Sequence, residues 1–321
     1  MGAESREPVT VAIPVLNGGM RLAEVLAAVR GQRLERPVEL VIADSGSTDG
    51  SAAVARHHGA EVISVAPSDF SHGATRNLLF ERASGSHVAF LTQDAVPADE
   101  SWLARLLEGF ELAEEVALVF GPYRPRPEAS ATVARELQEW FASFAPDGQP
   151  RVDRGAPQGI ATDRRLEFFT DANGCVARWA WERVPFQQVA YAEDQLLARD
   201  MLAEGYAKTY HPGAVVLHSH DYSPVELFRR RFDEWRGLHE VRGAVAQGNP
   251  LAMALAVQRQ VRDDLGYLRR RGAGRRPLVR AAAASLTHHV ASSSGAALGS
   301  RAKHMPERLR RACSLDGRGE A

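Results

Sequence analysis

The sequence has little cysteine and no long apolar run. Its two cysteines, Cys175 and Cys313, stand far apart with no second thiol nearby, which excludes a disulfide framework and a thiolate zinc site. No run of about 18 uncharged apolar residues occurs, and the stretch from Met1 to Thr10 has no apolar signal core. We therefore expect a protein of a reducing cytoplasm that is neither exported by a signal peptide nor spans a membrane.

The sequence also lacks an excess of charge of either sign. The formal net charge is −1, and acidic and basic residues are interspersed, so no overall field attracts nucleic acid. Among 321 residues, 45% are hydrophobic, which is enough to bury a substantial core. These features predict a folded globular chain whose partners do not include nucleic acid.

In the first half of the chain, short β-rich runs alternate with longer runs of helical pattern. We expect strands at residues 9–15, 38–44, 60–66, 87–93 and 116–123, and helices at 19–32, 50–59, 72–84 and 100–113. The strands show little alternation, which is typical of a parallel sheet covered by helices on both faces. Ligands of such sheets bind at the carboxyl ends of the strands.

The second half is less regular. After a break at residues 124–130 we expect a helix at 132–144 and a turn-rich, mobile stretch at 145–159. The remaining expectations are strands at residues 166–178 and 214–220, helices at 193–205 and 223–241, and Ala- and Arg-rich helices to the end of the chain.

Carboxylates follow two of the expected strands. Asp44 ends the strand at residues 38–44, and Asp94 comes directly after residues 87–93. The alternative is that each is simply a turn or helix-cap residue with no contact to a ligand, and we interpret Asp49 in this way. However, the ends of parallel strands meet at one edge, where Asp44 could accept hydrogen bonds from a base or ribose.

Two further stretches suggest contacts to a ligand. The strand 9–15 ends in the turn "IPVLNGG", whose exposed backbone could lie along a nucleotide. The stretch "FSHGATRN" places His72, Arg76 and Asn77 at the start of a helix, where backbone N–H groups and a guanidinium can face an anion. The alternative for this second stretch is a capped surface helix with one exposed arginine.

Acids and histidines recur near the end of this region. "YAEDQ" places Glu193 and Asp194 in the first turn of a helix, where acids favour the macrodipole and need no other role. "HSHDYS" places His218 and His220 two positions apart, so that both imidazoles point the same way on an extended segment. Together with an aspartate they could bind a divalent cation, although an isolated H-x-H is more often structural.

Taken in order, "IPVLNGG", "ADSGSTDG", "HGATRN", "FLTQDAVP", "YAEDQ" and "HSHDYS" resemble the family 2 glycosyltransferases, most closely their rhamnosyltransferase-like branch, over about residues 9–238. The resemblance implies a glycosyltransferase A-type fold, an α/β Rossmann-like sheet with a C-terminal helical extension. It implies a catalytic domain at 1–240, with a nucleotide-binding part at about 9–124 and an acceptor part at about 125–240, and helices at 241–321.

The resemblance also implies roles for single residues. Asp194 falls on the family's catalytic base with Glu193 beside it, and Asp94 falls on the last acid of its D-x-D motif, which binds Mg²⁺ or Mn²⁺. His218 falls on a third metal ligand, with His220 as the alternative. Here Gln93 replaces an acid of the motif, which leaves one carboxylate in that loop. The expected donor contacts are Pro14, Asn17, Asp44, Ser45, His72, Arg76, Asn77, Gln93 and Asp94.

The implied activity is that of an inverting hexosyltransferase, moving rhamnose from dTDP-rhamnose to a hydroxyl of a glycan, lipid-linked or small-molecule acceptor. A UDP- or GDP-sugar donor and a non-catalytic nucleotide-sugar-binding protein are the alternatives. A nicotinamide enzyme is disfavoured because "PVLNGGMR" lacks G-x-G-x-x-G. The arginine-rich C-terminal helices could form a homodimer or contact the inner face of a membrane peripherally, or remain a solvated appendage.

Overall fold

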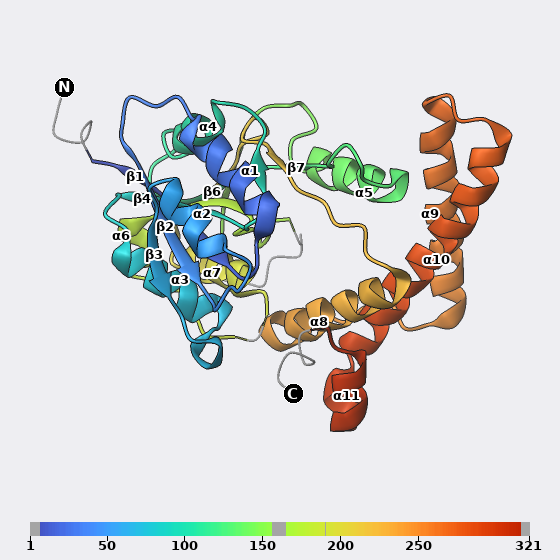
Figure 1. The fold of residues 1–321 in the computed structure, drawn as a ribbon. Coiled ribbons are helices and arrows are strands. Elements are labelled where there is room, and N and C mark those ends of the chain that lie inside the picture. The colour runs from blue at the N-terminus through green and yellow to red at the C-terminus, as the bar shows by residue number, and fades with distance from the viewer. Residues whose placement is uncertain (1–6, 156–164, 190, 316–321) are drawn as a thin grey trace. The chain divides into compact units, whose positions relative to one another are not determined.

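The computed structural model describes residues 7–155, 165–189 and 191–315 (Figure 1). The chain divides into two compact units. An α/β unit comprises Met1–Arg126, Leu137–Val189 and Glu193–Ser219, and a helical unit comprises Pro127–Glu136, Ala190–Ala192 and His220–Ala321. The last crossing between these units lies between residues 219 and 220, whereas the sequence led us to expect a domain boundary near residue 240.

The α/β unit is built on an eight-stranded sheet with the order β3-β2-β1-β4-β9-β6-β10-β8. Its strands are β1 (Val9–Val15), β2 (Val38–Asp44), β3 (Glu61–Ser64), β4 (His87–Leu91), β6 (Val116–Phe120), β8 (Arg151–Arg154), β9 (Asn173–Ala177) and β10 (Ala207–Tyr210). A second sheet of three short strands has the order β5-β11-β7 and contains β5 (Val96–Pro97), β7 (Tyr123–Arg124) and β11 (Val216–Leu217).

The strands expected in the first half of the chain, β1, β2, β3, β4 and β6, all run in one direction, as predicted, but the large sheet as a whole is mixed. Strand β9 runs antiparallel to both β4 and β6, and β8 runs antiparallel to β10. All five residues of β9 are buried. A strand buried on both faces shows the same apolar run in either direction, so its direction was not readable from composition.

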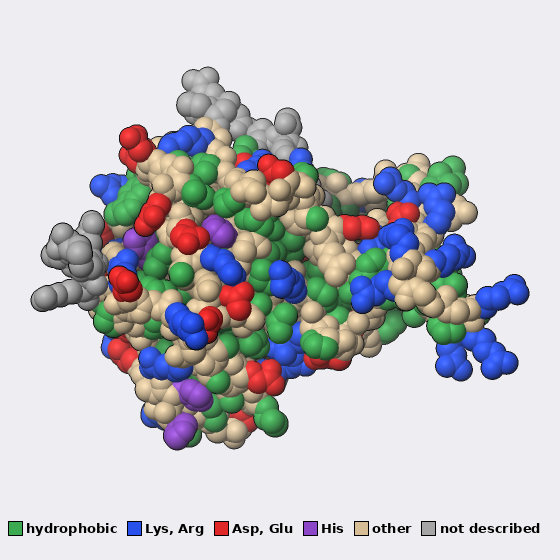
Figure 2. All heavy atoms as spheres, turned by 90° about the horizontal axis from the view of Figure 1, so that it is seen from above, with side chains coloured by type: hydrophobic (Ala, Val, Ile, Leu, Met, Phe, Trp, Pro, Cys, Tyr) green, Lys and Arg blue, Asp and Glu red, His purple; other side chains and the backbone are tan. Residues whose placement is uncertain are grey.

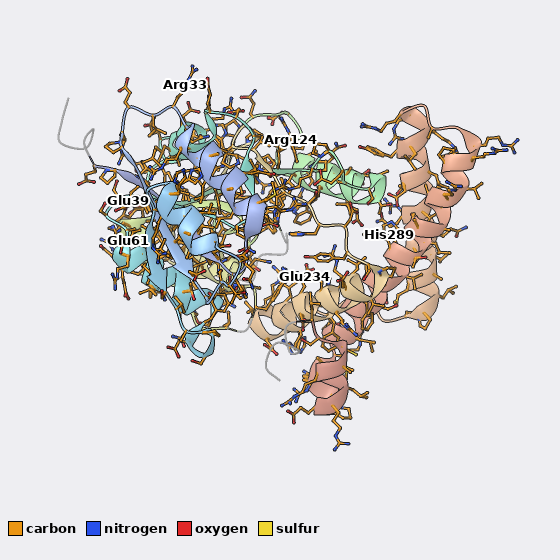
Figure 3. The ribbon with its side chains drawn as sticks, in the orientation of Figure 1. Arg33, Glu39, Glu61, Arg124, Glu234 and His289 are labelled. Carbon is orange, nitrogen blue, oxygen red and sulfur yellow. The ribbon has the colours of Figure 1, made fainter. Side chains whose placement is uncertain are left out.

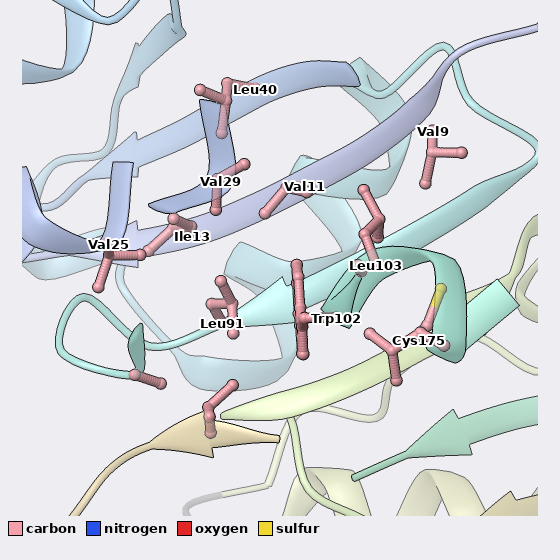
Figure 4. Packing of buried hydrophobic residues seen from close by; sticks show 14 of the residues in the cluster. Val9, Val11, Ile13, Val25, Val29, Leu40, Leu91, Trp102, Leu103 and Cys175 are labelled. Carbon is pink, nitrogen blue, oxygen red and sulfur yellow. The ribbon is translucent and has the colours of Figure 1, made fainter. Parts of the chain in front are cut away.

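Helices cover both faces of the large sheet. Side chains of α1 (Gly19–Arg30), α2 (Ser51–His57) and α4 (Trp102–Glu108) belong to one hydrophobic cluster (Figure 4). Side chains of α3 (His72–Arg82), α6 (Arg178–Trp181) and α7 (Glu193–Ala203) belong to the other. Val9, Val11, Ile13 and Val15 of β1 belong to the first cluster and Ala12 belongs to the second, because successive side chains of a strand point to opposite faces. Cys175 is buried in the first cluster.

Several expected elements are shorter in the structure. The strand expected at 87–93 ends at Leu91, so Asp94 lies in the turn beyond it. The strand expected at 166–178 is reduced to β9. The stretch 145–159, expected to be mobile, contains β8 at the sheet edge, and its residues 156–159 lie outside the described residues.

The helical unit contains α8 (Pro224–Arg242), α9 (Pro250–Arg270), α10 (Arg275–Gly299) and α11 (Glu307–Cys313). Ser223 and Glu226 form a capping box that starts α8, and Gly243 ends it in the left-handed conformation. The helix α5 (Ala131–Ala142) begins in this unit and ends in the α/β unit. Among the helices of the described residues, none combines the length and apolarity needed to cross a membrane.

Candidate active site

The loops after β1 and β2 interlock at one edge of the sheet. Asp44, the last residue of β2, is buried and lies in register with the last residue of β1. Its carboxylate accepts the backbone N–H of Ser47 at 3.3 Å. The backbone N–H of the buried Ser45 donates to the carbonyl oxygen of Val15, and Pro14 is half-buried within β1. Asp44 therefore stands at the predicted edge.

Two more side chains connect these loops. Asn17 has a φ of 51°, its Oδ1 accepts the backbone N–H of Thr48 at 2.9 Å, and its own N–H donates to Ser47 Oγ at 2.8 Å. Asp49 accepts the N–H groups of Ser51 at 3.0 Å and Gly19 at 2.9 Å. Asp49 is therefore not the helix cap that the sequence predicted, because the N-cap of α2 is Gly50 and has no side-chain cap bond. Asp49 instead links the starts of α1 and α2 at this edge of the sheet.

The hydrogen bonds of Gln93 account for an amide at a position where the family's D-x-D motif has an acid. Its Oε1 accepts the N–H of Leu16 at 2.9 Å, and its Nε2 donates to the Leu16 carbonyl at 3.1 Å. An amide has both a donor and an acceptor, whereas an ionised carboxylate only accepts. Gln93 therefore fastens the loop after β4 to the loop after β1, which a carboxylate could not do in the same way.

Asp94 and His218 lie side by side just beyond the strand ends. The imidazole Nδ1 of His218 is 3.5 Å from Asp94 Oδ1, and both side chains are mostly buried. Arg126 donates to the backbone carbonyl of Asp94 at 2.6 Å, and the ring of Tyr123 packs edge-on against the imidazole. A carboxylate oxygen and an imidazole nitrogen at this spacing fit two ligands of one divalent cation. His220 belongs to the helical unit.

Arg76 is the centre of a buried cluster of acids. Its Nε lies 2.6 Å from Asp171 Oδ2, and its Nη1 lies 2.6 Å from Glu193 Oε1. The guanidinium also donates to the carbonyl of His72 at 3.2 Å. Only 5% of Arg76 is exposed, so the guanidinium faces two carboxylates of the protein rather than an open anion site.

Asp194 is next to this cluster and has an unusual ionisation. Burial and the negative charge of Glu193 raise the pKa of Asp194 from 3.8 to about 7, although Arg76 and the N–H of Gln195 act in the opposite direction. Burial likewise raises the pKa of Asp171 well above its usual range, against the effect of Arg76. A carboxyl group that titrates near neutral pH can accept a proton under physiological conditions.

Asn77 and His72 differ in their surroundings. The Asn77 amide donates to the carbonyl of Phe186 at 2.9 Å and accepts from the Phe186 N–H at 3.1 Å and the Trp181 indole at 2.8 Å. These three bonds give Asn77 a packing role, so we place it outside the donor set. His72 is exposed at the first position of α3 and packs edge-on against Phe70.

The comparisons with known proteins agree with this geometry. The family model described as "Glycosyl transferase family 2" matches residues 10–163. O-antigen chain rhamnosyltransferase RfbN of Salmonella typhimurium is 31% identical over 231 residues, which cover 70% of each chain. The chain belongs to glycosyltransferase family 2. O-antigen chain rhamnosyltransferase WbaN of Salmonella anatum is 30% identical over 230 residues, again 70% of each chain.

Solved structures show that this glycosyltransferase has the A-type fold. Mannosyltransferase PcManGT from Pyrobaculum calidifontis, in complex with GDP-Man and Mn²⁺, superposes with a TM-score of 0.57 at 18% identity, covering 93% of this chain and 87% of that one. Glucosyl-3-phosphoglycerate synthase from Mycobacterium tuberculosis, in complex with Mn²⁺, UDP and phosphoglyceric acid, superposes with a TM-score of 0.51 at 20% identity. The match covers 75% of this chain and 81% of that one.

Asp171 was not among the site residues expected from the sequence of this glycosyltransferase. Site residues were expected only at the carboxyl ends of parallel strands. Because β9 is antiparallel to β4, its amino end reaches the same edge, and Leu91 pairs with Asn173 there. Asp171, two residues before Asn173, arrives beside Arg76 by this route. The signal was the acid in "TDANG", just ahead of a buried run.

Proposed function

We propose that this glycosyltransferase is an inverting enzyme that transfers rhamnose from dTDP-rhamnose to a hydroxyl of a glycan chain. The observation that carries the proposal is the carboxyl group of Asp194, with a pKa of about 7, in the same unit as the Asp94–His218 pair. The donor sugar and the glycan acceptor are supported by the two relatives, both named O-antigen chain rhamnosyltransferases.

In the proposed reaction the acceptor hydroxyl oxygen attacks the anomeric carbon from the face opposite the diphosphate. The hydroxyl proton passes to the carboxylate of Asp194, and the bond from the anomeric carbon to the diphosphate oxygen breaks. Its electron pair leaves on the nucleoside diphosphate. A single base is sufficient for this displacement, and such a base contributes about 10²–10⁴-fold in rate.

Asp194 is a better candidate for the base than Glu193. The carboxylate of Glu193 is buried and held by Arg76 at 2.6 Å, so it is already paired with a cation. Asp194 is half-buried, and its usual charged form is disfavoured by its neighbour. Of the two adjacent acids, only Asp194 combines access with a proton affinity suited to the reaction.

The donor is proposed to lie along the interlocked loops. Asp44 would accept hydrogen bonds from the nucleotide base, with Pro14, Asn17 and Ser45 beside it. Asp94 and His218 would hold Mg²⁺ or Mn²⁺. The cation, when bound, supplies positive charge to the diphosphate as it leaves. Two protein ligands leave the remaining positions to the diphosphate and water, as is usual for these ions.

The donor proposal is tested by hydrolysis of a panel of nucleotide sugars by the purified protein. We expect dTDP-rhamnose to be hydrolysed faster than UDP-glucose, UDP-N-acetylglucosamine and GDP-mannose. Mn²⁺ should strengthen dTDP binding in calorimetry, and Asp94→Asn and His218→Ala should each remove most of that gain. Faster hydrolysis of a UDP-sugar would contradict the donor. Tight binding of every sugar without turnover would instead indicate a binding protein.

A further inference from the structure

The helical unit contains a second polar cluster, formed by residues of that unit alone. Glu136 on α5 faces His288 and His289 on α10, and Asp264 on α9 lies behind His289 (Figure 3 labels His289). The side chains of His289 and Asp264 are 4% and 2% exposed, whereas Glu136 is 31% exposed. The cluster is therefore a buried polar site with one side toward solvent.

The spacing of the side chains suits one small cation. His288 Nε2 is 3.2 Å from Glu136 Oε2, and His289 Nδ1 is 3.6 Å from Glu136 Oε1. One ligand atom from each of the three residues lies within 4.8 Å of the other two. Ligands bound tetrahedrally to Zn²⁺ at its usual bond lengths are about 3.4 Å apart. The three atoms are thus close to a coordinating arrangement without a large rearrangement.

Asp264 determines which nitrogen of His289 is available. Its Oδ2 lies 2.9 Å from His289 Nε2 and also accepts from Ser285 Oγ at 2.6 Å and Thr132 Oγ1 at 2.9 Å. These donors and an ion pair with Arg135 keep the pKa of Asp264 well below its usual range despite burial. A carboxylate accepts, so we assign His289 Nε2 as the donor to Asp264, which leaves Nδ1 facing Glu136.

The contact between His289 and Glu136 then needs a positive partner. With the ring proton on Nε2, two acceptor atoms, His289 Nδ1 and Glu136 Oε1, face one another at 3.6 Å. Either a proton, which makes His289 an imidazolium, or a metal ion resolves this contact. Arg231 opposes a cation, but its own charge is paired with Glu234 at 2.6 Å.

We propose that Glu136, His288 and His289 form a Zn²⁺ site that fastens α5 to α10. Two imidazoles and one carboxylate with a water at the fourth position are an established ligand set for zinc. A carboxylate that holds the far nitrogen of a ligating histidine, as Asp264 does, is the usual support of such a site. All three ligands belong to the helical unit, so the role of the site is to stabilise that unit.

Calorimetric titration of the metal-stripped full-length protein with Zn²⁺, without nucleotide, tests the proposal. We expect a site whose affinity falls at least tenfold in His288→Gln and is unchanged in His304→Gln, which changes an exposed histidine of the same unit. His218→Gln is measured alongside because the Asp94–His218 pair can also take a cation. His288 is chosen because it lies at the rim, whereas replacement of the buried His289 would disturb the Asp264 network. Glu136→Gln gives a second, independent loss of one ligand and decides the case if His288→Gln does not fold.

The melting temperature gives a second readout. Saturating Zn²⁺ should raise the melting temperature of the wild type, because a ligand that binds only the folded state stabilises it. This rise should be lost in His288→Gln and Glu136→Gln but kept in His304→Gln. Zinc affinity equal in wild type and His288→Gln, or loss of binding only in His218→Gln, would overturn the proposal. Absence of any zinc binding would overturn it too and would indicate that a proton fills the contact.

Discussion

The ionisation of Asp194 makes the transfer rate depend on pH. A base must be deprotonated, so kcat/KM should rise about tenfold per pH unit below pH 7 and level off above it, following the pKa of about 7. Asp194→Asn should lower the rate by about 10²-fold or more and remove the pH dependence, with donor affinity nearly unchanged. Rates are measured from pH 5 to 9. Near-normal turnover of Asp194→Asn together with an inactive Glu193→Gln would assign the base to Glu193.

The same carboxyl group should cost stability at neutral pH. The pKa of Asp194 in the folded state lies above the unfolded value of 3.8, so between about pH 4 and 7 the folded protein binds more protons. Its contribution to the free energy of unfolding is therefore present below pH 4 and lost as pH rises through about 7. Asp194→Asn should melt at a higher temperature than wild type at pH 8 but not at about pH 3.5, below the unfolded pKa. A lower melting temperature at both values would indicate a structural role.

A variant of Arg76 distinguishes a role in positioning the acids from a direct contact to the donor. Arg76→Lys keeps one positive charge but cannot reach Asp171 and Glu193 together as the guanidinium does. The acids near Asp194 then repel it more strongly, and the rising limb of the pH–rate profile should move to higher pH. The rate at high pH and the donor KM should change little. A raised KM with an unmoved profile would mean that Arg76 binds the donor, as the helix-start pattern had suggested.

At the scale of elements, the contact between α8 and α10 depends on two glycines. A methyl group added at Gly295 would lie 2.2 Å from the backbone oxygen of Phe228, and one at Gly299 would lie 2.2 Å from that of Phe232. The two helices can approach this closely only without side chains there. Gly295→Ala should reduce the free energy of unfolding by about 1–3 kcal/mol through overpacking.

Gly266 on α9 is the matched control for this prediction. An added methyl group there would meet only the flexible end of Arg270 at 3.5 Å. Gly266→Ala should leave stability unchanged or increase it by about 0.5–1 kcal/mol, because glycine disfavours a helix interior. Urea unfolding of both variants checks the pair. Equal unfolding midpoints for Gly295→Ala and wild type would show that the helices can separate without cost.

At the scale of the whole molecule, the helical unit presents a concentrated positive charge. The turn between α9 and α10 and the helix ends beside it expose five arginines, and Figure 2 shows Lys and Arg side chains gathered at one end of this unit. They are Arg269, Arg270, Arg271, Arg275 and Arg276. We propose that this turn contacts an anionic bilayer. Each arginine near such a surface contributes about 1 kcal/mol, and the attraction weakens with salt.

Vesicle sedimentation tests this contact. The wild type should bind vesicles with anionic lipid and not neutral ones, and changing Arg270, Arg271 and Arg275 to Glu should weaken binding by about 10²-fold or more. Hydrolysis of the donor sugar should stay unchanged in the triple variant, since the turn belongs to the helical unit. Unchanged vesicle binding would contradict the proposal. A wild-type dimer in solution that the triple variant loses would point to self-association instead.

Much of the fold and part of the site could be predicted from short windows of sequence. The bounds of β1 and β2 agree with the expected 9–15 and 38–44, because apolar runs between turn residues encode burial locally. The adjacent acids Glu193 and Asp194 were found for the same reason. Their different roles were not, because they depend on Arg76, which is 117 positions from Glu193 in the chain.

The sequence by itself determined the order of strands and helices and the acids that follow strand ends, because these depend on neighbouring residues. Only the tertiary structure decided that β9 runs antiparallel and brings Asp171 to the site, and that Gln93 is used on Leu16, 77 positions away. It also decided the raised pKa of Asp194. A pKa depends on burial and on charges within a few ångströms, and distant segments supply both only after the chain has folded.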